Sequence, residues 1–388
     1  MTEVPSRNEA PAHVVFVLAG LAMGGAEAQL VAMLEAGADR AARHRVTVLT
    51  LTTARDASLV DRLVRLGVRI ETVDRAASGF PAFFLRLARW FRRERPDLVH
   101  TVLSGSAGTW GRLTARLAGV RAIIHSERSL GWRGTRLQRR LEPLAHRVTT
   151  RVLTNARAVE ERLLADGVPC AKLLLIRNGV DLERFSAVDG ASLRRSWGIA
   201  DGGVVAGFLG MLRPEKRPDL LLDALSELRE ADRPDMVAIA GDGPLMPEIR
   251  ARIEADAWAD DHVRLLGIIA DTPAFLAAID VLVLTSDTEG LPNAIIEAMA
   301  AGVPCIATRV SDVPDLVTDN GFVVDAGDVQ GLADALGRMR RMDPEERREL
   351  GRRGALRAEA EFDLQTAASR FWDAHDEVMR VRRRADPS

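Results

Sequence analysis

Short apolar runs rich in Val, Ile and Leu alternate along the whole chain with stretches in which apolar residues recur every three or four positions. The first pattern is typical of buried strands and the second of amphipathic helices. In the first half, the apolar runs predict strands near His13–Ala19, Arg45–Leu51, Val68–Val73, Asp97–Val102, Arg121–Ser126, Thr149–Thr154 and Leu173–Ile176. In the second half, they predict strands near Val204–Gly210, Met236–Ala240, Val263–Leu266, Val281–Leu284, Cys305–Thr308 and Phe322–Val324. Because strands that alternate with helices pair in parallel and need both faces covered, we expect an α/β protein with two doubly wound sheets of about six strands each.

The length of 388 residues exceeds what one hydrophobic core usually serves, which also favours two domains. Glycines at 190, 198, 202 and 203 interrupt the pattern between Ser186 and Gly203, so we expect the boundary there. We therefore expect a flexible tail at residues 1–12, a first domain at 13–190 and a second domain at 200–362. Residues 363–388 are expected to form a crossover helix and tail, and this helix can turn Phe371, Trp372 and Met379 toward the first domain.

The apolar run Val14–Ala19 has a second interpretation, because small residues and Ala26-Glu27-Ala28 follow it, as in a secretory signal. The segment before it carries Glu3 and Glu9 against only Arg7, which is not the positive charge that such a signal needs. A buried strand followed by a glycine loop fits better. No apolar run approaches the roughly 20 residues of a membrane-spanning helix.

Charge is divided unevenly, since residues 1–190 carry 29 Lys and Arg against 19 Asp and Glu, and residues 191–388 carry 24 against 36. The basic first half could attract phosphates, an anionic membrane surface or nucleic acid. No recognised nucleic-acid module is evident, so we expect no nucleic-acid partner. Cys170 and Cys305 are the only cysteines, which predicts no disulfide framework and a reducing, cytoplasmic setting.

The segment Asp287–Gly302 contains two carboxylates eight positions apart. Glu289 lies in a Gly/Pro-containing loop after the predicted strand at Val281–Leu284, and Glu297 lies on the helix that this loop opens. The backbone N–H groups in the range 290–294 have no intrahelical partners, so they can hold a phosphate or polarised hydroxyls. Acids also favour helix N-termini without any ligand, and that simpler interpretation stays open.

A pair of cations follows the strand that opens the second domain. Arg213 and Lys216 are three positions apart, at the carboxyl end of the strand, where open α/β sheets bind ligands. A planar guanidinium and a compact ammonium form a suitable clamp for a diphosphate whose negative charge grows as a bond to it breaks. The alternative is a solvated loop in which Glu215 pairs with these cations.

Two glycine turns also follow predicted strands. Gly24 and Gly25 come after the first strand and let the backbone approach a ligand, and Gly241 and Asp242 come after Met236–Ala240. Each turn can equally have a purely conformational role. Neither matches the Gly-x-Gly-x-x-Gly fingerprint, which weakens a dehydrogenase interpretation.

His125 ends a strand of the first domain within His125-Ser126-Glu127-Arg128, so its imidazole could reach the ligand from the opposite wall. A hydrogen-bonded core histidine is otherwise the commoner role.

Together these segments resemble the retaining, nucleotide-sugar-dependent glycosyltransferases of family 4, which have the two-Rossmann GT-B architecture. The resemblance covers nearly the whole chain. Glu289 and Glu297 match the family's Glu-x7-Glu signature, and Asn178-Gly179-Val180-Asp181 with Phe185 is similar to its Asn-Gly-Val-Asp segment. Arg217 departs from the family pattern, which usually has Gly after the Lys.

The resemblance implies a role for each site residue. Arg213, Lys216, Glu289 and His125 are expected to be catalytic, with Glu297 bonding the ribose hydroxyls and His125 beside the transferred sugar. The donor-binding residues are expected to be Gly24, Gly25, Gly241, Asp242, Gly290, Leu291, Pro292, Asn293 and Glu297. The acceptor side is expected to include Glu127, Arg128 and Asn155.

The implied reaction moves a sugar from a nucleoside-diphosphate sugar, with UDP as the expected nucleotide, to a hydroxyl of a glycan, glycolipid or small molecule with retention of configuration. We expect no cofactor and no metal, because no Asp-x-Asp motif is present to hold a divalent ion. Two other classes stay open: a sugar-nucleotide epimerase or glycan phosphorylase on the same scaffold, and a non-catalytic sugar-nucleotide-binding module.

The segment Phe83–Arg93 combines aromatic and apolar residues with arginines, and Arg133, Arg136, Arg139 and Arg140 form a second basic cluster. These segments could place the enzyme peripherally on an anionic membrane surface and present a lipid-linked acceptor. The simpler interpretation of the first segment is a packed helix with a solvated basic face.

Overall fold

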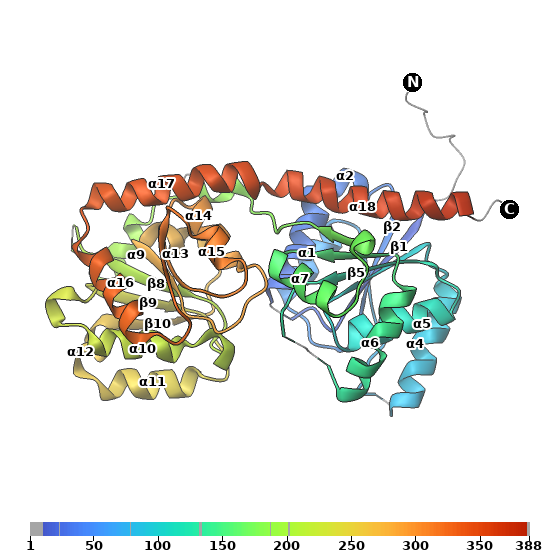
Figure 1. The fold of residues 1–388 in the computed structure, drawn as a ribbon, viewed down its shortest axis with the longest axis horizontal. Helices are drawn as coiled ribbons and strands as arrows, with labels where there is room; N and C mark the ends of the chain where they lie inside the picture. The colour runs from blue at the N-terminus through green and yellow to red at the C-terminus, as the bar shows by residue number, and fades with distance from the viewer. Residues whose placement is uncertain are drawn as a thin grey trace, which may run out of the picture. The chain divides into compact units, whose positions relative to one another are not determined.

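The computed structural model describes residues 11–22, 24–77, 79–131, 134–186, 188–200 and 202–385. Most of the tail expected at residues 1–12, together with Arg133, lies outside the described residues. The chain divides into two compact units: unit 1 comprises Met1–Gly179 and Leu364–Ser388, and unit 2 comprises Val180–Asp363. Each unit is an open parallel sheet with helices on both faces (Figure 1).

Unit 1 contains a seven-stranded parallel sheet with the order β3-β2-β1-β4-β5-β6-β7. Its strands are β1 (His13–Leu18), β2 (Arg45–Thr50), β3 (Arg69–Thr72), β4 (Leu98–Val102), β5 (Ala122–Glu127), β6 (Arg151–Thr154) and β7 (Leu173–Leu175). Every residue of β1 is buried, as expected of a central strand with both faces covered. The chain order reverses beside β1, so the carboxyl ends of β1 and β4 lie at a topological switch point.

The helical elements of unit 1 form two layers. They are α1 (Gly25–Ala36), α2 (Ala38–Ala41), α3 (Ala57–Arg65), α4 (Phe80–Glu94), the π-helical turn η1 (Ser106–Trp110), α5 (Gly111–Leu117), α6 (Arg136–Val148), α7 (Arg157–Ala165), η2 (Cys170–Lys172) and α18 (Leu364–Ala385). Phe83, Leu87, Trp90 and Phe91 turn one face of α4 into the core, at the spacing of an amphipathic helix. The packed-helix interpretation of the segment at Phe83–Arg93 is therefore confirmed.

The last helix returns to unit 1, as expected. The ring of Phe371 stacks on Phe16 of β1 with centroids 6.0 Å apart, and Trp372 meets Phe16 edge-on. Both aromatic residues are buried in the core that covers this face of the sheet. Their burial ties the C-terminal segment to a strand more than 350 positions earlier in the chain.

A buried histidine pair also joins α18 to the sheet. His375 Nδ1 lies 2.7 Å from the carbonyl oxygen of Phe371, and because a carbonyl can only accept, Nδ1 carries the proton. His375 Nε2 then accepts from His100 Nδ1–H at 3.0 Å, and His100 Nε2 accepts from the Ser126 hydroxyl at 2.7 Å. The chain of hydrogen bonds thus fixes the neutral tautomer of both histidines.

Unit 2 contains a six-stranded parallel sheet with the order β10-β9-β8-β11-β12-β13. Its strands are β8 (Val205–Leu209), β9 (Met236–Ala240), β10 (Val263–Gly267), β11 (Val281–Leu284), β12 (Cys305–Thr308) and β13 (Gly321–Val324). Its helical elements are α8 (Leu182–Ser186), α9 (Ala191–Ser196), η3 (Pro214–Lys216), α10 (Pro218–Glu227), η4 (Glu230–Asp232), α11 (Met246–Ala255), α12 (Ala257–His262), α13 (Thr272–Ala278), α14 (Asn293–Ala300), α15 (Val313–Leu316), α16 (Val329–Arg341) and α17 (Pro344–Glu361). The order reverses beside β8, which makes the carboxyl ends of β8 and β11 the expected ligand-binding edge.

All thirteen predicted strands are present within one or two residues of their expected ends. The boundary between the units differs, because it falls between Gly179 and Val180 rather than at 186–203. The glycines expected to mark a linker instead separate short helices that belong to unit 2. There α8 contacts α13 and α14, and α9 contacts α13.

Within the described residues, no helix is long and apolar enough to cross a membrane.

Candidate active site

Two loops of unit 2 are joined at the carboxyl ends of β8 and β11. The Thr285 hydroxyl is directed at the carbonyl oxygens of Lys216 and Arg217, at 2.8 and 2.7 Å. The backbone N–H of Asp287 donates to the carbonyl of Glu215 at 2.9 Å. The predicted cation loop and the predicted carboxylate loop are therefore held side by side.

The Lys216 ammonium forms an ion pair with the Glu289 carboxylate. Glu289 also accepts a hydrogen bond of 2.7 Å from the Ser286 hydroxyl, and its side chain is only 9% exposed, against 26% for Lys216. Arg213 is more exposed and lies 3.9 Å from Glu215, which is a loose contact. The alternative interpretation, in which Glu215 pairs with both cations, thus holds only as a loose contact with Arg213, because Lys216 pairs with Glu289.

Arg217 occupies the position where the resembling family usually has glycine. Its backbone is left-handed, with φ of 49° and ψ of 50°, a conformation that glycine adopts freely and arginine rarely. The guanidinium pairs with Asp219 at the start of α10 and with Asp287 of the other loop. These partners, Asp219 foremost, raise the pKa of Arg217. The loop therefore keeps a glycine-like backbone despite the substitution.

The turn after β9 packs directly on the loop after β8. Gly241 has φ of 141°, and a Cβ at this position would lie 1.8 Å from the carbonyl oxygen of Gly210. The backbone N–H of Leu212 donates to the Asp242 carbonyl at 3.0 Å. Only glycine at position 241 therefore lets the turn after β9 pack against the backbone of the loop after β8. The Asp242 side chain remains exposed.

Glu297 lies on α14, one of the helices beside β11 and β12. Its burial raises the pKa of the carboxyl to about 7, although the positive charge of Arg184 acts in the opposite direction. Gly290, Leu291, Pro292 and Asn293 lead into the first turn of this helix. A carboxyl with this pKa changes protonation near neutral pH, and donors that bond to it would favour its ionised form.

Two hydroxyl residues at the carboxyl end of β12 and in the loop after it were not predicted. The buried Thr308 hydroxyl donates to the carbonyl of Ser286 at 2.6 Å, and Ser311 donates to the carbonyl of Gly290 at 2.6 Å. Their only signal in the sequence is their position at the carboxyl end of a predicted strand. They hold the carboxylate loop against the loop after β12.

In unit 1, His125 is fully buried on β5. Its Nδ1 lies 2.9 Å from the Thr101 hydroxyl and 3.2 Å from the Thr101 carbonyl, which assigns the proton to Nδ1. Its Nε2 has no hydrogen-bond partner among the described residues and lies 3.8 Å from Glu127. Burial, and next the positive charge of Arg112, hold the pKa of His125 well below its usual value, so the ring is a neutral acceptor.

The acceptor-side residues occupy neighbouring strand ends. Glu127 is buried beside Arg162 at 3.6 Å, and burial raises the pKa of its carboxyl. Arg128 donates to the Asn178 amide oxygen, and burial lowers the pKa of its guanidinium to about 10. Asn155 follows β6, and within the part of the chain that the structure describes its buried Oδ1 has no hydrogen-bond partner. The structure thus brings His125 and Glu127 together and turns Arg128 toward Asn178.

Gly24 caps the N-terminus of α1 and Gly25 begins the helix. Gly24 has extended backbone, and a Cβ there would meet only the far end of the Glu27 side chain, at 2.5 Å. The close approach of backbone to ligand that was predicted here is compatible with this geometry but is not tested by it.

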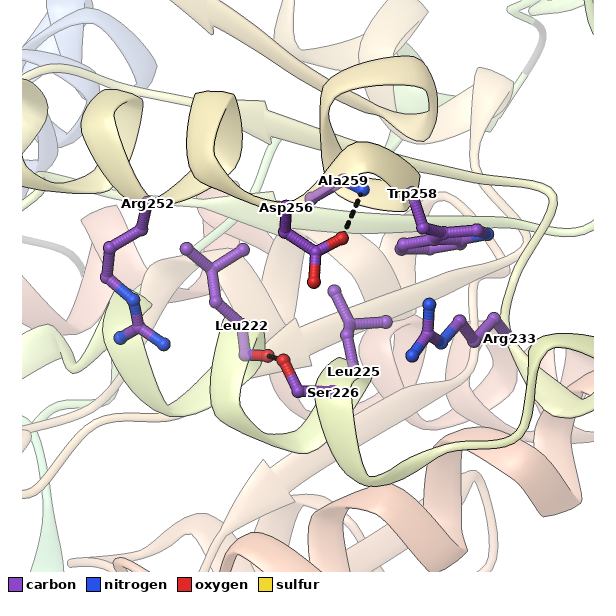
Figure 2. Close-up of a pocket in the computed structure, with 8 residues that line it drawn as sticks. All are labelled: Leu222, Leu225, Ser226, Arg233, Arg252, Asp256, Trp258 and Ala259. Atoms are coloured by element: carbon purple, nitrogen blue, oxygen red, sulfur yellow. Dashed lines mark hydrogen bonds between the residues drawn. The ribbon is translucent and has the colours of Figure 1, made fainter.

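A small cavity of about 30 Å³ lies elsewhere in unit 2, among α10, α11 and α12 (Figure 2). Arg233 lies over the ring of Trp258, 4.8 Å from its centroid, at one end of the cavity. This volume has room for about one water molecule, and none of the predicted site residues lines it. Among the described residues, no group of three or more His, Cys, Asp and Glu side chains is arranged to hold a metal ion.

Comparisons with known proteins place the chain in a family. The model described as Glycosyltransferase Family 4 matches residues 23–184, and the model described as Glycosyl transferases group 1 matches residues 203–341. An Escherichia coli protein named UDP-Gal:alpha-D-GlcNAc-diphosphoundecaprenol alpha-1,3-galactosyltransferase is 32% identical over 66% of this chain and 69% of its own length. A GDP-mannose-dependent alpha-(1-6)-phosphatidylinositol monomannoside mannosyltransferase from Mycolicibacterium smegmatis is 32% identical over 62% of this chain and 66% of its own length.

Solved structures agree on the fold. The Anabaena protein HepE, crystallised with UDP and glucose, superposes with a TM-score of 0.81 at 21% identity, over 94% of this chain and all of that one. WaaG, a glycosyltransferase involved in lipopolysaccharide biosynthesis, has a TM-score of 0.72 at 16% identity, over 94% of this chain and 99% of that one. The chain therefore belongs to the family 4 glycosyltransferases, enzymes of the transferase class with the two-domain GT-B fold.

Proposed function

We propose that this glycosyltransferase moves a sugar from a UDP-sugar to an acceptor hydroxyl with retention of anomeric configuration. The bond between the anomeric carbon and the diphosphate oxygen breaks, and the acceptor oxygen bonds to the same face of that carbon. A diphosphate oxygen takes the acceptor's proton, so the step needs no enzyme nucleophile. Arg213 and Lys216 stabilise the charge that builds on the diphosphate.

The observation that carries this proposal is the pairing of Lys216 with Glu289 in loops joined at the carboxyl ends of β8 and β11. A cation for the diphosphate and a carboxylate for sugar hydroxyls are thus available at one edge of unit 2. The name of the Escherichia coli relative contains UDP-Gal, and the name of the Mycolicibacterium relative contains GDP-mannose. We favour UDP, and Glu297 is the proposed partner of the ribose hydroxyls.

Thermal shift with UDP, GDP and ADP tests the choice of nucleotide, because only a bound ligand raises the melting temperature. A panel of donor sugars with NMR of the product then reports the anomeric configuration. Stabilisation by UDP and a product that keeps the donor's configuration are expected. An inverted product, or release of free sugar or an epimer without transfer, would reject the proposal.

The acceptor hydroxyl is proposed to bind unit 1. His125 Nε2 and Asn155 Oδ1 are buried acceptors for which no described residue supplies a donor, and the buried hydroxyl of Thr154 likewise has no partner among these residues. Such atoms are costly to leave unpaired, and sugar hydroxyls could donate to them. His125→Ala and Asn155→Ala are expected to raise the acceptor KM by about tenfold, the scale of one or two lost hydrogen bonds. An unchanged acceptor KM in both variants would move the acceptor site elsewhere.

We further propose that unit 1 meets an anionic membrane through the outer faces of α4, α5 and α6, which contact one another in that order. This surface is defined by exposed apolar residues and by exposed arginines for which no ion pair occurs among the described residues: Phe80, Leu85, Leu117, Leu137, Leu144, Arg89, Arg92, Arg116, Arg136, Arg139, Arg140 and Arg147. Unpaired arginines beside exposed apolar side chains complement anionic headgroups over acyl chains. The apolar face of α4 that the sequence suggested for membrane contact packs into the core, so the proposed contact uses the outer face of this helix instead.

Sedimentation with vesicles tests this surface. Binding to vesicles that contain phosphatidylglycerol, but not to pure phosphatidylcholine, is expected, and the double variant Arg139→Glu/Arg140→Glu should abolish it. The charge-matched control replaces two exposed arginines of unit 2, Arg195→Glu together with Arg250→Glu. Equal binding of the double variant and the control would exclude α6 as the contact.

Metal independence is also proposed, because the cations of the chain can neutralise the leaving group. Transfer measured after treatment with EDTA is expected to match the untreated rate. A loss that Mg²⁺ or Mn²⁺ restores would overturn this part of the proposal.

A further inference from the structure

Ser311, between β12 and α15, has an unusual backbone conformation. Its φ of 48° lies in the left-handed region, where glycine is favoured and a serine is strained. Glycine would adopt the same backbone without strain, so the serine is expected to supply something that glycine lacks. Its hydroxyl donates a hydrogen bond of 2.6 Å to the carbonyl oxygen of Gly290.

This hydrogen bond restrains the residues that follow Glu289. The peptide group between Gly290 and Leu291 is trans and planar, so fixing its carbonyl also fixes the opposite direction of its N–H. Gly290 directly follows Glu289, and the same bond therefore restrains the backbone from which the Glu289 carboxylate projects.

The start of the carboxylate loop has its own restraint. Thr308 donates to the carbonyl of Ser286, before Glu289, whereas Ser311 donates to the carbonyl of Gly290, after it. One hydroxyl at the end of β12 and one in the loop after it thus hold the segment 286–290 at both ends. Of these two, only Ser311 acts on the side that leads into α14.

We infer that Ser311 is a positioning residue for the donor sugar, which it serves by fixing the Gly290 peptide and the Glu289 carboxylate. This inference rests on the proposed function, because it assigns Glu289 to the sugar. The inference distinguishes sugar binding from nucleotide binding. The hydrogen bond from Ser311 holds the loop proposed to contact the glycosyl group, and it leaves the contacts of Glu297 with the nucleotide unchanged.

The test compares three substitutions in the full chain. Ser311→Ala removes the hydroxyl and keeps the backbone strain, Ser311→Gly removes both, and Ser311→Thr keeps the hydroxyl. Ser196→Ala is the matched control, because Ser196 is an exposed serine that also donates to a backbone carbonyl. The measurements are kcat and KM for transfer, the Kd of UDP, and the melting temperature of each variant.

Both Ser311→Ala and Ser311→Gly are expected to lower kcat/KM for the donor by about tenfold or more, the scale of one lost hydrogen bond to a positioned group. The Kd of UDP should stay within twofold, and Ser311→Gly should melt at a higher temperature than Ser311→Ala. Ser311→Thr should transfer faster than Ser311→Ala, although it should melt at a lower temperature than wild type because a β-branched residue is more strained at positive φ.

Wild-type kcat/KM in Ser311→Gly would overturn the inference, since the residue would then serve only the backbone turn. An equal loss of UDP affinity and transfer would also overturn it, because the sugar would not be singled out. If the wild-type chain transfers no sugar at all, the proposed function fails instead, and the two failures are thus distinguishable.

Discussion

Lys216 and Glu289, which lie 73 positions apart on separate loops of unit 2, form an ion pair with each other. Each belongs to a different part of the proposed donor, since Lys216 is assigned to the diphosphate and Glu289 to the sugar. When a donor binds, the two side chains therefore have to share their ion pair with the donor, or exchange it for contacts with the diphosphate and the sugar. This exchange makes the two residues separable by experiment.

Lys216→Ala and Glu289→Ala are each expected to lower transfer at least ~100-fold, the scale of removing an electrostatic stabiliser. Their effects on UDP binding should have opposite signs. Loss of the cation weakens UDP binding, whereas Glu289→Gln removes a competing negative charge and should tighten it by about two- to fivefold, the range of a partly exposed ion pair. Isothermal titration with UDP measures both, with Arg250→Ala as an exposed control. Weaker UDP binding in Glu289→Gln would contradict the exchange.

Glu297 is expected to release a proton when the donor binds. Its raised pKa of about 7 leaves it half protonated at neutral pH, and accepting hydrogen bonds from ribose hydroxyls favours the carboxylate. Donor affinity should therefore fall as the pH is lowered below 7, by up to about tenfold per pH unit. Titration with a UDP-sugar in buffers of different ionisation enthalpy measures the proton; UDP itself is unsuitable because its terminal phosphate titrates near pH 6. A buffer-independent enthalpy at pH 7, the same as in Glu297→Gln, would reject the assignment.

The sequence predicts the strands well because parallel strands buried on both faces need continuous apolar runs, as in β1. The pairing of the two charged loops follows the same logic, since Lys216 and Glu289 are both expected at the carboxyl ends of strands and lie together there; their role in a donor site stays a prediction. The residues that hold those loops are not predictable, because Thr308 and Ser311 act through single hydrogen bonds that leave no periodic pattern.

Contacts between distant segments are also missed. The hydrogen bond from His100 to His375 joins positions 275 apart, and nothing in the local sequence of either residue indicates the other. The unit boundary is misplaced for a related reason, because glycines near 190–203 report local turns and not the packing of α8 against α13 and α14.

Gly241→Ala is expected to destabilise unit 2 severely. The added Cβ would lie 1.8 Å from the backbone oxygen of Gly210, and backbone atoms cannot move aside as the end of a flexible side chain can. A loss of about 3 kcal/mol or more in the free energy of unfolding is expected, together with loss of the UDP thermal shift. Gly267→Ala is the matched control, because Gly267 also has positive φ but open space around it, so only about 1 kcal/mol of backbone strain is expected. Equal urea midpoints for the two variants would contradict the close-packing argument.

The buried histidine pair predicts that unit 1 is destabilised by acid. Burial lowers the pKa of His375 to about 4 in the folded chain, although the hydrogen bond to the Phe371 carbonyl and the charge of Asp376 act in the opposite direction. Between about pH 6.5 and pH 4 the unfolded chain therefore binds the proton that the folded chain refuses. Stability is accordingly complete above pH 6.5 and falls as the pH is lowered, by about 1.4 kcal/mol per pH unit from this residue.

Urea unfolding followed through tryptophan fluorescence measures this slope, since Trp372 packs against the His375 ring with centroids 5.3 Å apart. In His375→Gln the amide oxygen can still accept from His100 Nδ1–H but cannot take up the proton, so the slope between pH 4 and 6.5 should flatten while stability at pH 7 changes less. If His375→Gln kept the full slope, the acid sensitivity would belong to groups other than His375, such as His100, whose pKa burial also lowers.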